Sequence, residues 1–287
     1  SALPDPGMDA KNWVQQCVQV PFELSKRLFD CALIKISSRE FLWYLNVHHL
    51  IADGWSIGII YRTLSDLYGR SVEGKRGETE PFARFHDYLE HERQFQASPR
   101  YRKNEEYWKQ KMSESAEPIS FYGKAPSKET TKTRRISRAL GRDRMEKLKA
   151  LAALLDSGSG TEESSLMNVF SAVLAAYLHR QSGSRDLCLG VPFHNRRTRA
   201  FKGAIGFFSE VLPVRISISE AETFVSLGRK IKTQIFEAIR HGPFVLANPH
   251  HQKAYDVLIN FHVQTYPPFS GIPIHFRWAD SGRSAAR

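Results

Sequence analysis

The chain has 287 residues, of which 41% are hydrophobic and 25% are charged, the balance of an ordinary globular protein. This composition excludes a disordered chain, a collagen-like repeat and a disulfide-dense mini-protein, and the length suits one large or two medium domains. Lys and Arg number 41 against 30 Asp and Glu, which gives a net charge of +11. The basic residues are dispersed and do not alternate with aromatic residues, so we expect no nucleic-acid partner.

The sequence carries no signal for membranes or for disulfides. No apolar run reaches the roughly 20 residues of a membrane helix, and the first residues have neither the basic start nor the apolar core of a signal peptide. Cys17, Cys31 and Cys188 lie in apolar stretches without the spacing of zinc ligands. We therefore expect a cytoplasmic protein with three reduced, buried thiols and no membrane contact.

Hydrophobic periodicity alternates between helices and strands along the chain, which indicates an α/β fold. The predicted strands lie at residues 41–47, 186–191, 212–218 and 255–263. The predicted helices lie at residues 56–67, 143–155, 165–180 and 224–240, with a long charged helical region at 81–112. Glycine, proline and small polar residues gather at 118–138, and from this shift we predict two parts, 1–122 and 123–287.

The most informative local feature is a pair of histidines, His48 and His49, directly after the strand at 41–47. Histidine has an unperturbed pKa near 6.5, which suits proton transfer at neutral pH. Neighbouring side chains of an extended segment point to opposite sides, so one histidine can face a cavity while the other packs inward. Asp53 can hold the following turn through a buried charge pair, and Gly54 allows a ligand to approach the backbone.

Spacing alone leaves other interpretations of this segment open. A zinc site needs a His-x-x-x-His pair or a third ligand nearby, so we expect no metal. A hydrolase triad is disfavoured because the chain has no Gly-x-Ser-x-Gly elbow. A purely structural histidine pair at a strand end fits the spacing as well as a catalytic pair does.

Residues 47–56 resemble the His-His-x-x-x-Asp-Gly signature of the condensation domains of nonribosomal peptide synthetases, which are chloramphenicol-acetyltransferase-like acyltransferases. Trp55 and Ser56 follow the glycine as they do in that family. Segments similar to later motifs of the family follow in the same order, at residues 85–88, 190–196, 205–215 and 255–261. Phe85 replaces a tyrosine of the pattern, and Glu210 stands where the family usually has asparagine. The opening motifs and the last strands of the family have no counterpart in these residues.

The resemblance implies a fold and a first set of roles. The fold would be two chloramphenicol-acetyltransferase-like α/β sandwich lobes, arranged as a V-shaped pseudo-dimer with the active-site tunnel between them. His49 would face the tunnel as the catalytic residue, and His48 would pack inward. Trp55, Ser209 and Glu210 would line the tunnel.

The resemblance also pairs Asp53 with an arginine of the second lobe. The matching position is Arg196, and the adjacent Arg197 is the alternative. In this interpretation Asp53 and Gly54 belong to the catalytic motif through the shape of the turn, and Asp53 is not the base.

The function implied is amide-bond formation between a donor acyl thioester and the amine of an aminoacyl acceptor. Both substrates would arrive on the phosphopantetheine arms of carrier proteins, the expected partners, and the domain itself would bind no cofactor. Two alternatives stay open. One is a lipid-loading starter domain that uses fatty acyl-CoA, which the segments at 192–196 and 209–213 also resemble. The other is a catalytically degenerate module that recruits partner proteins.

Overall fold

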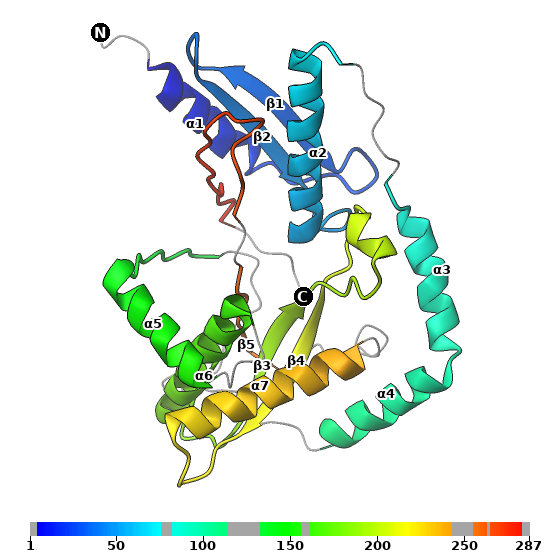
Figure 1. Ribbon diagram of the computed structural model, residues 1–287, viewed down its shortest axis with the longest axis vertical. Coiled ribbons are helices and arrows are strands. Elements are labelled where there is room, and N and C mark those ends of the chain that lie inside the picture. The colour runs from blue at the N-terminus through cyan, green and yellow to red at the C-terminus, as the bar shows by residue number, and fades with distance from the viewer. Residues whose placement is uncertain are drawn as a thin grey trace.

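The computed structural model describes residues 5–75, 82–113, 133–155, 161–242, 255–262 and 265–282. Figure 1 shows two parts, an upper one built on strands β1 and β2 and a lower one built on strands β3, β4 and β5. Helices α3 and α4 run along one side between them. The predicted boundary after residue 122 and the predicted loop at 156–160 lie outside the described residues.

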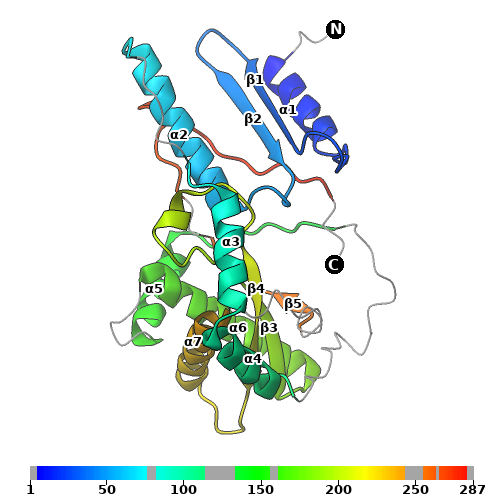
Figure 2. The same cartoon turned by 90° about the vertical axis from the view of Figure 1, so that its right-hand side faces the viewer.

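The first part is a β-hairpin with a helix on each face. Its elements are α1 (Pro6–Cys17), β1 (Phe29–Lys35), β2 (Phe41–Val47) and α2 (Gly54–Val72). In Figures 1 and 2 the antiparallel hairpin lies between α1 and α2. Because neighbouring strand residues point to opposite faces, Trp43 stacks on Tyr61 of α2 while Tyr44 packs edge-on against Trp13 of α1. The predicted strand and helix are confirmed as β2 and α2, and α1 and β1 are additional elements.

Helices α3 (Phe85–Gln96) and α4 (Pro99–Lys111) lead from the first part to the second. The predicted helical region over residues 81–112 is confirmed as two helices, because the helix is interrupted at Ser98. This residue is extended, with φ −83° and ψ 154°, and its hydroxyl accepts a hydrogen bond from the Tyr101 N–H. Proline disfavours the helical conformation in the residue before it, and at the first helical position its missing N–H costs nothing. Pro99 therefore starts a new helix.

The second part is a three-stranded sheet in the order β4–β3–β5. Its elements are α5 (Arg142–Leu155), α6 (Glu162–Ser182), β3 (Asp186–Phe193), the short 3-10 helix η1 (Ala200–Gly203), β4 (Glu210–Ser217), α7 (Phe224–His241) and β5 (Val257–Leu258). Strand β3 pairs antiparallel with β4 and parallel with β5. The helices and the first two strands predicted here are confirmed to within three residues at each end.

The main core lies between this sheet and the helices α6 and α7. It is formed by alternate residues of β3 and β4, which share one face of the sheet, together with small and aliphatic residues of the two helices: Leu187, Leu189, Val191, Leu212, Val214, Ile216, Ala172, Ala175, Leu178, Leu227, Ile231 and Ile235. Trp108 of α4 is only 1% exposed and joins this core, and its indole N–H donates to the carbonyl of His241 at 2.7 Å. Helix α4 is thereby anchored to the second part.

Two predictions need correction. The strand predicted at 255–263 is short: the paired strand is Val257–Leu258, the backbone hydrogen bonds that are described stop at Ile259, and Val263 lies outside the described residues. The expectation of three buried thiols holds for Cys188, whereas Cys17 is half-buried and Cys31 is exposed. Among the described residues, no helix is both long and apolar enough to cross a membrane.

A second, aromatic cluster joins α3 to the chain between β3 and β4. Tyr88 of α3 packs with Phe201, Ala204 and Phe208, all at most 8% exposed. Gly206 lies in the same segment and passes so close to α3 that a Cβ added there would lie 2.3 Å from Cδ2 of Phe85. This close approach fixes the segment 201–209 against the helix that comes from the first part.

We predict that Gly206→Ala lowers the free energy of unfolding by about 1–3 kcal/mol, because the added methyl group displaces the Phe85 ring. Urea unfolding measures the loss, and Phe85→Leu should recover part of it in the Gly206→Ala background. Gly203→Ala is the matched control, since no described atom beyond its chain neighbours lies within 4 Å of a Cβ at that position. Equal stability of the two alanine variants would contradict this packing.

Candidate active site

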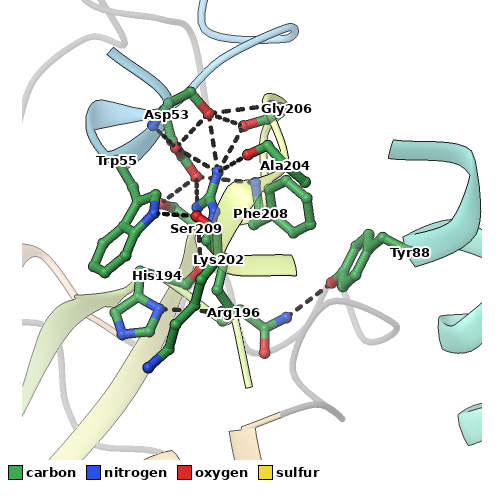
Figure 3. Close-up of polar contacts among 12 residues, drawn as sticks. Asp53, Trp55, Tyr88, His194, Arg196, Lys202, Ala204, Gly206, Phe208 and Ser209 are labelled. Carbon is green, nitrogen blue, oxygen red and sulfur yellow. Dashed lines mark hydrogen bonds and ion pairs between the residues drawn. The ribbon is translucent and has the colours of Figure 1, made fainter. Parts of the chain in front are cut away.

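The predicted site residues gather where four segments of the chain meet. These are the end of β2, the start of α2, the chain after β3 and the chain before β4. Figure 3 shows side chains of the last three. The first two belong to the first part and the others to the second, so the site lies where the two parts of the structure touch.

Asp53 is the N-cap residue of α2. Its Oδ1 accepts a hydrogen bond of 2.9 Å from the backbone N–H of Ser56, which otherwise has no partner within the helix. A carboxylate at this position also interacts favourably with the positive end of the helix dipole. The Asp-Gly turn predicted from the sequence therefore starts the helix, and Gly54 is its first residue.

Arg196 forms a bidentate ion pair with Asp53 across 143 residues of chain. Nη1 lies 2.6 Å from Oδ2 and Nη2 lies 3.0 Å from Oδ1. The residues are 1% and 2% exposed, so both charges are removed from water. The guanidinium also stacks on the Phe208 ring, with 4.0 Å between Cζ and the ring centroid, which adds a cation–π attraction. Arg197 points elsewhere: its Nη2 donates to the carbonyl of Ile239.

The carboxylate of Asp53 is also hydrogen-bonded to the segment before β4. The Phe208 N–H donates to Oδ2 at 3.1 Å, and the Ser209 hydroxyl donates to the same atom at 3.2 Å. Burial alone would raise the pKa of the carboxyl, but the hydrogen bonds from Arg196, Ser56 and Phe208 outweigh it and hold the pKa below its usual range. Asp53 thus stays ionised and has no lone pair left to act as a base.

Ser56 completes this network, although its role was not predicted. Its hydroxyl lies 2.9 Å from Asp53 Oδ1 and 2.8 Å from the Gly206 carbonyl, and it accepts from the Gly206 N–H and from Arg196 Nη2. One serine therefore contacts both members of the ion pair and the backbone of the second part. The available signal was its position three residues after an N-cap aspartate, the spacing of the capping box.

The two histidines have different surroundings. His48 is half-buried, its Nδ1 accepts from the Leu50 N–H at 3.1 Å, and its ring lies edge-on to Phe22. His49 is exposed, and its ring lies edge-on to Phe207 of the second part, with 5.1 Å between the ring centroids. Within the part of the chain that the structure describes, the ring nitrogens of His49 have no protein partner. They are therefore available to a ligand.

Trp55 and Gly54 contact two further histidines. The Trp55 indole N–H donates to the Lys202 carbonyl at 3.0 Å, and its ring lies 5.1 Å from that of His194 (Figure 3). Burial, together with the nearby Arg196, lowers the pKa of His194 and keeps that ring neutral. A Cβ at position 54 would lie 3.6 Å from Cε1 of His262, an ordinary contact distance.

The three residues expected to line the tunnel lie in three different environments. Trp55 is 37% exposed, Ser209 is half-buried against Asp53, and Glu210 is only 2% exposed. The Glu210 carboxyl points into the second part, where its Oε1 accepts from the side-chain amide of Asn195. Asn195 was not predicted, and its place directly before Arg196 was the one signal for it.

Within the described ranges, no group of three or more His, Cys, Asp or Glu side chains is placed to hold a metal ion.

Comparison with known proteins places these residues in a family. A family model described as "Condensation domain" matches residues 4–248. A dimodular nonribosomal peptide synthase of Bacillus subtilis (strain 168) is 28% identical over 242 residues, which is 84% of this chain and 10% of that protein. Phosphinothricin tripeptide synthetase PhsC of Streptomyces viridochromogenes is 30% identical over 226 residues, 77% of this chain and 20% of that protein.

Solved structures agree with this result. The first condensation domain of the calcium-dependent antibiotic synthetase, in complex with a substrate analogue, superposes with a TM-score of 0.76 at 25% identity, over 95% of this chain and 63% of that chain. The starter condensation domain of rhizomide synthetase RzmA shares the fold, with a TM-score of 0.67 at 24% identity, over 90% of this chain and 58% of that chain. The expected α/β fold is therefore confirmed, and the chain spans less than two thirds of these structures.

We predict that Asp53→Ala and Arg196→Ala each lower the free energy of unfolding by about 3–5 kcal/mol, because each leaves a buried charge without its partner. In a double-mutant cycle measured by urea unfolding, the double variant should cost much less than the sum. Because the folded-state pKa of Asp53 is lowered, its contribution is present above the unfolded carboxyl pKa and is lost as the pH falls through the folded-state value.

The matched control is Arg185 with Glu220, an ion pair of 2.6 Å whose side chains are 60% and 79% exposed. Removal of either residue should cost less than about 1 kcal/mol, since water screens the pair. Additive losses for Asp53 and Arg196 would show that they do not act as partners.

Proposed function

Because the chain belongs to the condensation-domain family, we propose that it is an acyltransferase that forms an amide bond in nonribosomal peptide synthesis. The donor is an acyl thioester, and the acceptor is the amine of an aminoacyl group. The observation that carries this proposal is the exposed His49 at the end of β2, beside a buried ion pair that joins the two parts of the structure. The partners are donor and acceptor carrier proteins, whose phosphopantetheine arms bring both substrates, and the cytoplasmic location stays a prediction.

The reaction needs modest chemical assistance. A thioester is already activated, and a free α-amine has a pKa near 8, so about a tenth of it is unprotonated and nucleophilic at pH 7. The amine nitrogen attacks the thioester carbonyl carbon, the C–N bond forms and the C–S bond breaks. The proton lost by the amine passes to the leaving thiolate. Holding the two reacting groups together supplies much of the rate.

His49 supplies the site for this proton. Its ring nitrogens have no protein partner among the described residues, so one can accept the proton from the attacking amine, hydrogen-bond the tetrahedral intermediate, or do both. Since the ring packs against Phe207 of the second part, its position depends on contact between the two parts. Substrates would reach it through a tunnel between the lobes, with Trp55 and Ser209 on its wall.

His48 and Asp53 support the site in this proposal. The Nδ1 atom of His48 already accepts the Leu50 N–H, which closes the turn after β2. The Asp53 carboxylate is occupied by Arg196 and by the segment before β4. Both side chains therefore shape the turn that carries His49.

Two alternatives compete with this function. In the first, the donor is a fatty acyl group on coenzyme A; one neighbour in the fold is a starter condensation domain whose solved structure includes C8-CoA. In the second, the domain recruits proteins without catalysis. The intact Asp53–Arg196 pair next to an unoccupied His49 ring favours an enzyme over a recruiting module.

We predict that His49→Ala abolishes amide formation, or reduces it at least about 100-fold, because the variant loses the ring that accepts the amine proton in this proposal. The measurement is turnover of loaded donor and acceptor carrier proteins, repeated with a fatty acyl-CoA donor to separate the two substrate classes. His86→Ala is the control, since this histidine is exposed on α3 and belongs to none of the four segments that form the site. Turnover of His49→Ala at the parent rate would instead favour the recruiting module.

A second prediction uses the net charge of +11. Carrier proteins similar to those of synthetases are acidic around the helix that bears phosphopantetheine, so the basic excess should raise the association rate more than the lifetime of the complex. Binding should weaken with salt, because the Debye length falls from about 10 Å at 0.1 M to about 3 Å at 1 M. Titration with a loaded carrier protein measures this, and duplex DNA is the control. An affinity that does not change with salt would show that docking is apolar.

A further inference from the structure

Asn195 has an unusual backbone conformation in the chain after β3, which carries Arg196. It lies directly before Arg196, its φ is 48°, and it is 5% exposed. This is the left-handed region, which few residues other than glycine adopt and in which asparagine is among the most tolerated. The turn at this one residue redirects the chain after β3 and determines the direction in which Arg196 leaves the backbone.

The side-chain amide of Asn195 is fixed from three directions. Its two amide hydrogens are directed at Oε1 of Glu210, at 2.7 Å, and at the hydroxyl of Tyr88, at 2.9 Å. Figure 3 shows the bond that reaches Tyr88. Its Oδ1 accepts from Nε of Arg197 at 3.3 Å. The tethers therefore come from β4, from α3 and from Arg197, two residues further along the chain.

We propose that Asn195 is a positioning residue for Arg196, and that Glu210 and Tyr88 hold it in the left-handed conformation that this task requires. Asn195 contacts neither Asp53 nor the reacting atoms, so it acts through the ion pair. The tether from Tyr88 also links α3 to the same loop. The effect on turnover that this inference predicts rests on the proposed function, whereas the network itself can be tested without it.

The charged and titratable groups around Glu210 leave its carboxyl neutral. On α3, Tyr88 donates a hydrogen bond to Glu92, and the Glu92 carboxylate repels a negative charge on Glu210. Arg197, in the chain after β3, attracts a negative charge on Glu210. Arg100 of α4 in turn faces Arg197. Burial, with Glu92, outweighs Arg197 and raises the pKa of Glu210 to about 8. Oε2 has no partner among the described atoms, so it accepts no hydrogen bond that would stabilise the charged form. Oε1 of the neutral carboxyl then accepts the hydrogen bond from the Asn195 amide, and no charge on Glu210 is buried without a partner.

This arrangement has a definite pH dependence. Since the folded-state pKa is raised above the unfolded value, the folded protein holds the proton between about pH 4.5 and 8, and stability falls as the pH rises through this window. Glu210→Gln keeps the accepting oxygen but cannot ionise. It should therefore melt at the same temperature as the parent at pH 5, and about 4 °C above it at pH 9.

The stability experiment compares melting temperatures of the full chain at pH 5, 7 and 9. Glu210→Leu removes the accepting oxygen and should melt below Glu210→Gln at every pH, because the Asn195 amide loses a partner. Glu40→Gln is the matched control for the substitution itself, since Glu40 is exposed and lies outside this network. The proposal is overturned if Glu210→Gln differs from the parent equally at pH 5 and 9, or if Glu210→Leu is as stable as Glu210→Gln.

A double-mutant cycle tests the link to Arg196. Asn195→Gly keeps the left-handed backbone but loses the tethers. The decrease in melting temperature that it causes should be smaller in the Arg196→Gln background than in the parent. Should Arg196→Gln not fold, Ser209→Ala removes one hydrogen bond to Asp53 and serves as the milder partner. Additive effects would overturn the positioning role.

Turnover provides the last readout. Asn195→Gly should lower kcat about tenfold with KM unchanged, and the rate of Glu210→Gln relative to the parent should increase from pH 7 to pH 9. A parent chain that forms no amide would refute the proposed function, while the melting experiments still decide the role of Asn195. An active parent with an unchanged Asn195→Gly variant would refute the inference alone.

Discussion

The buried ion pair between Asp53 and Arg196 is the interaction on which the rest of the site depends. Removing two charges from water costs several kcal/mol per ion, so the pair depends on the further hydrogen bonds made by its carboxylate and by the Nη atoms of its guanidinium. Ser56, Phe208 and the Gly206 backbone provide these bonds, and they come from both parts of the chain. The network therefore forms only when the two parts are in register. His49 lies after β2, four residues before Asp53, so its position depends on the same alignment of the two parts.

Two buried carboxyls near the same loop show how surroundings determine charge. Asp53 accepts from a guanidinium and two backbone N–H groups, and its pKa is lowered despite burial. Glu210 accepts from one neutral amide and faces the carboxylate of Glu92, and its pKa is raised. Each lies near an arginine, but Arg196 makes a bidentate contact, whereas Arg197 acts only at a distance. The geometry of the contact with arginine, more than the distance to its charge, therefore determines whether a buried carboxyl is ionised, as Asp53 is, or neutral, as Glu210 is.

Sequence patterns predicted the elements that local chemistry determines and failed where distant segments cooperate. The strand β2, the helix α2 and the Asp-Gly turn follow from periodicity and capping, which act within a few residues. The break at Ser98 was also readable from a serine followed by proline, but the helical periodicity across it concealed it. The strand at 255–263 was too long because its pairing with β3 ends at Ile259, and pairing is not a local property. The only local signal for Asn195 is its place directly before Arg196, since its partners come from α3 and β4.

The contrast between a fixed support and an unconstrained histidine suits the chemistry proposed for this site. Two tethered, already activated substrates need a proton acceptor at a constant place, and they need it unoccupied. The Asp53 carboxylate is fully hydrogen-bonded and stays ionised, and both Nη atoms of Arg196 are engaged, so the pair holds the turn without competing for the proton. His49 is exposed, and its described contact with the second part is the edge of Phe207, which leaves both ring nitrogens available. The rigidity of the ion pair and the availability of His49 are thus complementary requirements, and the same turn meets both.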